Sequence, residues 1–252
     1  MKNKRHFDAY HLVFFSIGFI LSFAILQYYP NLQIKSAESV SLSTLPQESM
    51  HSSAYVVAVT SDGGGLVGSV DVEINPGRGR VLMNTNPFLE PDTQYSAETA
   101  AAIAEQYTKK SLADRDVIYS FDIDGQVLGG PSAGAAMTIA TIAAAEGKQV
   151  RNDVAVTGTI NSDGTVGPVG GVLEKAEASA EKGVKLFLVP EGQSQLTTYE
   201  RVVEQQNRGG FVFQRVRYVP KTLDLVEYAK SDLGIEVREV ATIGEAASYM
   251  VI

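Results

Sequence analysis

The order of apolar and polar residues predicts a chain in which strands and helices alternate. Strict alternation between Leu66 and Ile74 is typical of a strand with one buried face, and Val117–Ile123 follows the same rule. Segments that are rich in alanine, or that carry apolar residues at helical spacing, predict helices. The expected strands are 55–59, 66–74, 81–83, 116–123, 154–156, 184–190 and 235–240. The expected helices are 97–110, the alanine-rich run 135–145 that ends near Gly147, 172–182, 223–231 and 243–250.

These elements predict a mixed α/β (α+β) fold in a single domain that covers 54–252. Of the 252 residues, 44% are hydrophobic, which is enough to fill one core.

The most apolar segment lies near the N-terminus. A basic segment, 1–11, precedes an apolar run at 12–29, and these 18 residues would span about 27 Å as a helix. That length just crosses the ~30 Å hydrocarbon core of a bilayer. We therefore expect one transmembrane helix. A cleavable signal peptide is the alternative, although no small-x-small site closely follows the run, and a buried core helix fits poorly because the run has no polar face.

The distribution of basic residues predicts the orientation of this helix. Lys2, Lys4 and Arg5 precede the run, and Lys35 alone follows it closely. The N-terminus is then expected in the cytoplasm and the rest of the chain outside it. Residues 30–53 are rich in serine and have weak periodicity, so they read as a linker.

Ser132 stands at the start of the alanine-rich helix, within Gly129-Gly130-Pro131-Ser132-Ala133-Gly134. Unpaired backbone N–H groups and the positive end of the helix dipole at this place suit a nucleophile. They equally suit a plain N-cap, which is a common role of serine before a helix. The motif G-x-S-x-G at 130–134 also matches the nucleophile elbow of α/β-hydrolases, which needs a downstream histidine.

No histidine follows Ser132, because His6, His11 and His51 all precede it, and the chain has no cysteine. A base for Ser132 would then be a carboxylate or a lysine with a lowered pKa. Lys175 is the candidate, because no carboxylate lies three or four residues away from it in the helix 172–182. A lysine among small and apolar groups loses solvation and becomes neutral more easily. An ordinary surface lysine is the alternative.

Four short segments between 130 and 175 occur in a fixed order. The first is G-P-S-A-G at 130–134, and it is followed by T-G-T-I at 157–160 and G-T-V-G-P-V-G-G at 164–171. The last is G-G-V-L-E-K at 170–175, which shares its two glycines with the segment before it. Together they resemble the signature segments of the Lon protease family, whose proteolytic domain uses a Ser-Lys dyad. The resemblance implies that Ser132 is the nucleophile, that Lys175 is the base 43 positions later, and that Thr157 hydrogen-bonds the lysine.

The resemblance covers roughly 54–252 and has three departures. Gly129 stands where many members of the family carry an acidic residue. The stretch 194–217 is longer than usual, as a flap or an interface would be. The ATPase module of Lon does not occur in these 252 residues, and they contain no G-x-x-x-x-G-K-[ST] phosphate loop.

The chemistry that follows is peptide-bond hydrolysis without ATP. Neutral Lys175 would take the proton of Ser132, and backbone N–H groups of the 129–133 turn would hold the oxyanion. Gly129 and Gly130 would let the substrate backbone approach closely. The expected substrates are peptides or unfolded proteins. The resemblance also implies self-association, commonly as a hexameric ring.

Charge and composition argue against some classes of partner and cofactor. A net charge of −8 argues against nucleic acid. The aspartates at 122, 124, 153 and 163 lack the histidines and spacing of a transition-metal site, so we assign no metal and no cofactor. Two alternatives stay open: a membrane-tethered binding or scaffold module that does not cleave, and a peptidase that depends on a separate ATPase.

Overall fold

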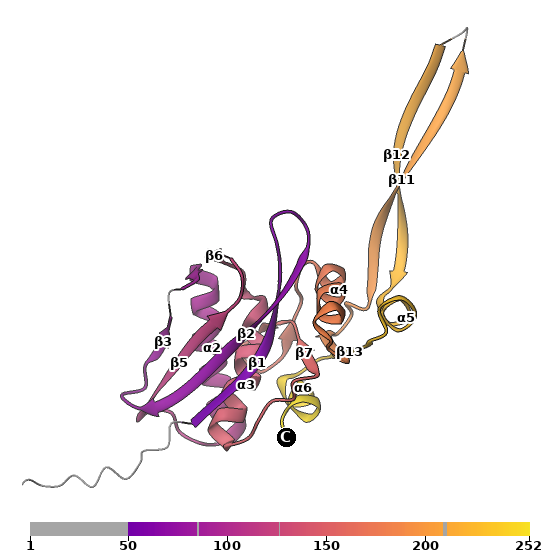
Figure 1. Cartoon of the computed structure of the whole chain (residues 1–252). Coiled ribbons are helices and arrows are strands. Elements are labelled where there is room, and N and C mark those ends of the chain that lie inside the picture. The colour runs from indigo at the N-terminus through magenta and orange to yellow at the C-terminus, as the bar shows by residue number, and fades with distance from the viewer. Residues whose placement is uncertain (1–49, 85, 126, 209–210) are drawn as a thin grey trace, which may run out of the picture. The chain divides into compact units, whose positions relative to one another are not determined.

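The computed structural model describes residues 50–84, 86–125, 127–208 and 211–252. Helices and strands alternate along this part of the chain, so the predicted mixed α/β class is confirmed (Figure 1). The expected transmembrane helix at 12–29 and most of the expected linker lie outside the described residues. Within the described ranges, no helix is long and apolar enough to cross a membrane.

A four-stranded sheet is formed by the N-terminal half of the domain. Its strands, in spatial order, are β1 (Met50–Val59), β2 (Gly65–Pro76), β5 (Arg115–Asp122) and β3 (Val81–Met83). The β1–β2 and β2–β5 pairs are antiparallel, whereas β3 runs parallel to β5. Strand β1 begins at Met50 and not at the expected residue 55, so 50–53 belong to the sheet and not to the linker.

A second, parallel sheet has the strand order β13 (Glu236–Val240), β10 (Leu186–Pro190) and β7 (Val154–Val156). Successive side chains of β10 point to different cores: Leu188 contributes to one buried cluster, and Phe187 contributes to the other. A parallel sheet that is buried on both faces reads as a continuous apolar run, which is the pattern of 186–190.

In the described ranges, five α-helices pack around these sheets. They are α2 (Pro91–Thr108), α3 (Gly134–Glu146), α4 (Val172–Lys182), α5 (Leu225–Tyr228) and α6 (Ile243–Met250). Helix α3 contacts β1, β2, α2 and α6, and its residues from Gly134 to Ala145 are all buried. Its alanines allow this close approach, because a small side chain lets the helix lie near its neighbours on every side.

Two helices have the predicted bounds and two do not. Helix α4 covers 172–182 and ends at Gly183 with φ 92°, and α6 covers 243–250, both as expected. Helix α2 begins at Pro91, six positions before the expected start at residue 97, because proline is well suited to the first turn of a helix. The expected helix 223–231 is divided between the end of a strand, α5 and a π-helical turn, Ala229–Leu233.

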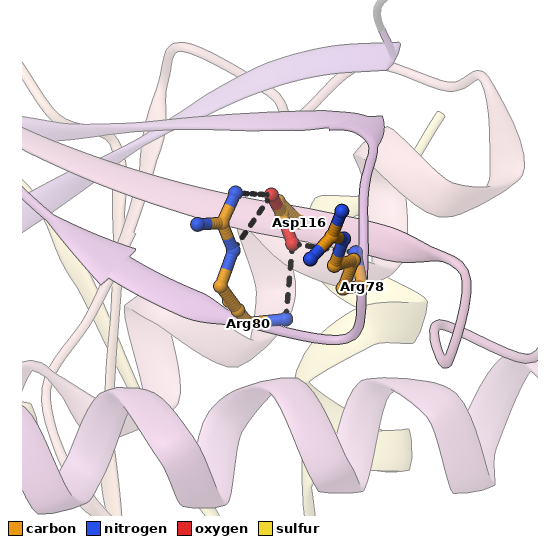
Figure 2. A network of polar contacts seen from close by, with 3 residues as sticks. All are labelled: Arg78, Arg80 and Asp116. Carbon is orange, nitrogen blue, oxygen red and sulfur yellow. Dashed lines mark hydrogen bonds and ion pairs between the residues drawn. The ribbon is translucent and has the colours of Figure 1, made fainter.

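The turn between β2 and β3 is held by Asp116, as Figure 2 shows. Its Oδ1 accepts hydrogen bonds from the backbone N–H groups of Arg78 (2.9 Å) and Arg80 (3.1 Å). Its Oδ2 accepts two more from the guanidinium of Arg80. This guanidinium holds the pKa of the Asp116 carboxyl well below its usual range. The aspartate therefore ties the G-R-G-R turn to the start of β5.

The stretch expected as a flap or an interface forms a long β-hairpin. Strands β11 (Gln195–Arg208) and β12 (Phe211–Asp224) pair antiparallel along their full length, from Gln195 opposite Asp224 to Arg208 opposite Phe211. At its base the hairpin continues into α5, where the Asp224 side chain accepts hydrogen bonds from two N–H groups of the helix. The insertion is longer at its C-terminal end than the expected boundary at 217.

Candidate active site

Ser132 lies in a short 3₁₀ turn, η1 (Pro131–Ala133), that leads directly into α3. Neither η1 nor α3 receives a side-chain hydrogen bond at its N-cap position, so the described structure does not use the Ser132 hydroxyl as a helix cap. The serine is half-buried. Its side chain is therefore left available for a role other than capping.

Gly158 fixes the backbone between this serine and the first turn of α3. Its N–H donates to the carbonyl of Ser132 (3.1 Å), and its own carbonyl accepts from the N–H of Ala135 (3.0 Å). Gly134 packs so tightly on β8 (Thr159–Ile160) that an added β-carbon would lie 2.9 Å from the backbone nitrogen of Ile160. The last glycine of G-P-S-A-G is thus required by a close backbone approach.

Lys175 is buried inside the domain on α4, with only 2% of its surface exposed. Its Nζ donates a hydrogen bond to Oγ1 of Thr157 at 3.2 Å. Loss of solvent lowers the pKa of Lys175 to about 8, and the charge of Glu174 opposes part of this change. The surface-lysine alternative is therefore wrong: at neutral to mildly alkaline pH an appreciable fraction of this amine is neutral.

The end of strand β7 connects the two residues. Thr157, fully buried, holds the amine of Lys175, and the next residue, Gly158, holds the backbone of Ser132. Thr157 is itself fixed by a hydrogen bond from its N–H to the carbonyl of Leu188 in β10 (3.0 Å). Two consecutive residues of one strand end thus set the relative position of the serine turn and the lysine helix.

Ser132 and Lys175 line the same cavity, which has a volume of about 500 Å³. Its walls also include Gly129, Gly130 and the loop from Pro168 to Gly171. A second cavity of about 420 Å³ runs along the end of β1 from Val56 to Ser61. Ser132, Gly129 and Gly130 line both cavities, so the serine stands where the two meet.

Comparison with known proteins agrees with this arrangement. Residues 36–224 match the Lon protease (S16) C-terminal proteolytic domain. The chain belongs to this family. The match to the Lon domain begins earlier than the expected boundary at residue 54 and ends at residue 224, the last residue of the hairpin.

Individual Lon proteases are similar over about half of the chain. The Archaeal Lon protease of Archaeoglobus fulgidus is 31% identical over 138 residues, which are 53% of this chain and 22% of that protein. Lon protease of Phenylobacterium zucineum is 33% identical over 133 residues, 50% of this chain and 16% of that protein. Lon protease of Desulfatibacillum aliphaticivorans is 30% identical over 167 residues, which are 64% of this chain and 20% of that protein. The matched region is thus about a fifth of each relative.

In this Lon-type domain, the start of helix α2 supports the serine turn, which the sequence pattern did not reveal. Oγ1 of Thr93 donates to the carbonyl of Gly130 (3.1 Å), and Oδ1 of Asp92 accepts from the N–H of Gly130 (3.3 Å). The carboxylate of Glu90 occupies the space that a β-carbon on Gly129 would need. A carboxylate therefore does lie beside position 129, but it comes from a distant part of the chain.

These contacts change the expectation for the oxyanion site. The N–H of Gly130 is engaged by Asp92, whereas the N–H of Ser132 is the first of the 3₁₀ turn and has no acceptor three residues earlier inside the turn. A donor to a developing oxyanion is thus expected from Ser132 more than from Gly130. Gly130 has φ 86°, which only glycine adopts readily, and so it shapes the turn.

Proposed function

We propose that this chain is a membrane-anchored, ATP-independent serine endopeptidase that cleaves peptides and unfolded proteins through a dyad of Ser132 and Lys175. The observation that carries the proposal is the burial of Lys175 in the cavity that Ser132 also lines. Burial makes the amine a usable base, because its pKa of about 8 lies near physiological pH.

In the proposed reaction, Oγ of Ser132 attacks the carbonyl carbon of the peptide bond while Nζ of Lys175 takes its proton. The tetrahedral oxyanion accepts hydrogen bonds from the turn N–H groups. The Lys175 ammonium then gives its proton to the leaving amine, and the carbon–nitrogen bond breaks. Water hydrolyses the acyl-serine, with Lys175 again as the base. Thr157 orients the amine throughout.

The two cavities that meet at Ser132 suit an extended peptide. A folded domain could not place its backbone against Gly129 and Gly130, whereas an extended segment can enter both cavities at once. The proposal of an ATP-independent enzyme with unfolded substrates rests on this geometry and on the lack of a phosphate-loop motif in the sequence.

The proposed location is a single-pass membrane protein with its N-terminus in the cytoplasm and the catalytic domain outside. It rests on the apolar run at 12–29 and on the basic residues before it. Protease added to intact cells should digest the catalytic domain; protection of that domain would refute the orientation.

Activity is tested with the purified full chain in a mild non-ionic detergent, with casein as an unfolded substrate and without ATP. Cleavage should be abolished by Ser132→Ala and by Lys175→Met. The matched control is Lys182→Met, because Lys182 lies on the same helix and is exposed. Cleavage that survives either dyad substitution would refute the dyad. Cleavage only after addition of a separate ATPase would favour the partner-dependent alternative, and binding without cleavage would favour the scaffold module.

A further inference from the structure

We propose that the β11–β12 hairpin of one copy of this chain docks on the outer surface of helix α2 in the next copy, so that the copies associate head to tail. Beyond its base, where Leu196 packs on a buried cluster of the domain, the hairpin is the largest element of the described structure that has no cover for either of its faces (Figure 1). The proposal concerns a contact surface and does not depend on whether the enzyme cleaves.

The two faces of the hairpin differ in chemistry. Because side chains alternate along a strand and opposite residues share a face, Tyr199, Val203, Val216, Tyr218 and Pro220 lie on one side, with Arg201 as the charged residue among them. We call this side the apolar face. The other side carries five charged residues, Glu200, Glu204, Arg215, Arg217 and Lys221, beside the apolar Val202, Phe213 and Val219, so the two faces differ mainly in charge. On this side Arg217 donates to the Glu204 carboxylate at 3.3 Å.

The apolar face is exposed to a degree that is unusual for such side chains. Tyr199 and Tyr218 are each 66% exposed, and Val216 is 43% exposed. A two-stranded ribbon without a covered face is marginally stable in water. A contiguous apolar surface on such a ribbon marks a place where another protein surface binds.

Charge identifies the partner as a second copy of this chain. The hairpin carries five basic and three acidic residues, whereas the whole chain carries 21 basic and 29 acidic residues. The hairpin is therefore a positive element of a negative protein. A positive, apolar ribbon is complementary to the acidic surface of another copy, and like-charged copies would otherwise repel one another.

Helix α2 and the short strand just before it, β4 (Phe88–Leu89), offer the complementary surface. Phe88 is 61% exposed and Tyr95 is 70% exposed, the two most exposed aromatic side chains of the domain outside the hairpin in the part of the chain that the structure describes. The exposed carboxylates of Glu90, Asp92 and Glu98 lie next to them in the sequence. Two aromatic rings with acidic neighbours match the tyrosines and Arg201 of the apolar face.

The hairpin and the α2 surface belong to different parts of the domain. The hairpin is joined to α5, while α2 packs on α3 and η1 (Figure 1). When two copies meet through two unlike surfaces, the pair still has one unused hairpin surface and one unused α2 surface. Further copies can therefore be added until a ring closes. Docking at α2 would also place the neighbour beside Asp92 and Thr93, which hold the turn of Ser132. This last consequence rests on the proposed function.

Cross-linking tests the contact directly, because the chain has no cysteine of its own. Gln214→Cys places a thiol on the apolar face, and Ala102→Cys places one on the exposed side of α2. A short bismaleimide should link the full chains into dimers only when the two variants are mixed. Ser231→Cys, exposed beyond α5, replaces Ala102→Cys in the control mixture and should give no dimer. Dimers from Gln214→Cys alone would show a hairpin-to-hairpin contact and overturn the proposal, as would the lack of dimers in the mixture.

A matched pair of substitutions tests the apolar face. Val216 and Val219 are 43% and 41% exposed and lie on opposite faces of β12. Val216→Glu should weaken association by roughly thirtyfold, the effect of removing a central contact residue, whereas Val219→Glu should leave it nearly unchanged. Equal effects of the two substitutions, measured by analytical ultracentrifugation, would overturn the assignment. Unchanged thermal unfolding of both variants establishes that the fold is intact.

Complementation distinguishes a head-to-tail contact from any symmetric one. Val216→Glu removes only the hairpin surface, and Tyr95→Lys combined with Glu98→Lys removes only the α2 surface. At a concentration where the wild-type chain associates but a contact weakened thirtyfold does not form, each variant alone should be monomeric, and their mixture should form a dimer that cannot grow further. A mixture that stays monomeric would refute the head-to-tail arrangement, whatever the casein assay shows.

Discussion

Replacing Lys175 by methionine should stabilise the folded protein while abolishing its proposed activity. Methionine has a similar length and no charge, so it fills the same space among the buried residues of α4. A buried ammonium, in contrast, has lost its hydration. A residue whose removal makes the protein more stable and inactive is held in place for function and not for the fold.

The magnitude follows from the pKa of the lysine. Burial lowers it from 10.5 to about 8, and each pKa unit corresponds to about 1.36 kcal/mol. Below pH 8, keeping Lys175 charged in the folded protein therefore costs about 3 kcal/mol. The substitution also removes the partner of the Thr157 hydroxyl, which costs about 1 kcal/mol. The expected net gain in the free energy of unfolding at pH 7 is about 2 kcal/mol.

The sign of the pH dependence is a second part of the same prediction. Between the folded pKa of about 8 and the unfolded value of 10.5, the unfolded chain binds more protons at this site than the folded protein. The stability of the wild-type protein consequently rises with pH across this window. The advantage of Lys175→Met should be largest below pH 8 and should decrease towards pH 10.5.

Urea denaturation of the full chain at pH 7, 8.5 and 10, followed by circular dichroism, measures these differences. Lys182→Met is the control: this exposed lysine on the same helix should change stability by a few tenths of a kcal/mol at most. A Lys175→Met protein that is less stable than wild type at pH 7, by an amount that does not change with pH, would refute the idea that this amine is desolvated.

Three further predictions follow from other contacts. Thr157→Val should reduce the rate of casein cleavage about tenfold, since it removes the hydroxyl that holds the Lys175 amine, and Thr157→Ser should restore most of the rate. Gly134→Ala should lower the free energy of unfolding by ~1–3 kcal/mol in urea titrations, although alanine is the better helix former, because its methyl group would collide with Ile160. A stabilised variant would contradict that collision. Asp116→Asn should lower the thermal midpoint at pH 7, and the difference from wild type should shrink below about pH 4, because the depressed pKa of Asp116 stabilises the fold only while the carboxyl is ionised. A difference that is constant between pH 3 and pH 7 would count against the ionic contact with Arg80.

The sequence predicted those features that depend on neighbouring residues. Helix α4 has the expected bounds because the glycine that ends it is a local signal, which can be recognised from a few adjacent residues. The spacing of Ser132 and Lys175 also selected the pair that the structure brings to one cavity. The early start of α2 was missed. The helix starts at Pro91, because proline suits the first turn of a helix.

What only the tertiary structure decided depends on residues that are far apart in the chain. Sequence alone left Ser132 as a nucleophile or a cap and Lys175 as a base or a surface lysine. Thr157 contacts the amine of Lys175 and Gly158 contacts the backbone of Ser132, and these contacts decide how the two residues are held. Burial lowers the pKa of the Lys175 amine. The carboxylate of Glu90 beside Gly129 has no local signal at all. Local patterns determine where elements begin and end, whereas solvation and side-chain partners arise only when distant segments pack together.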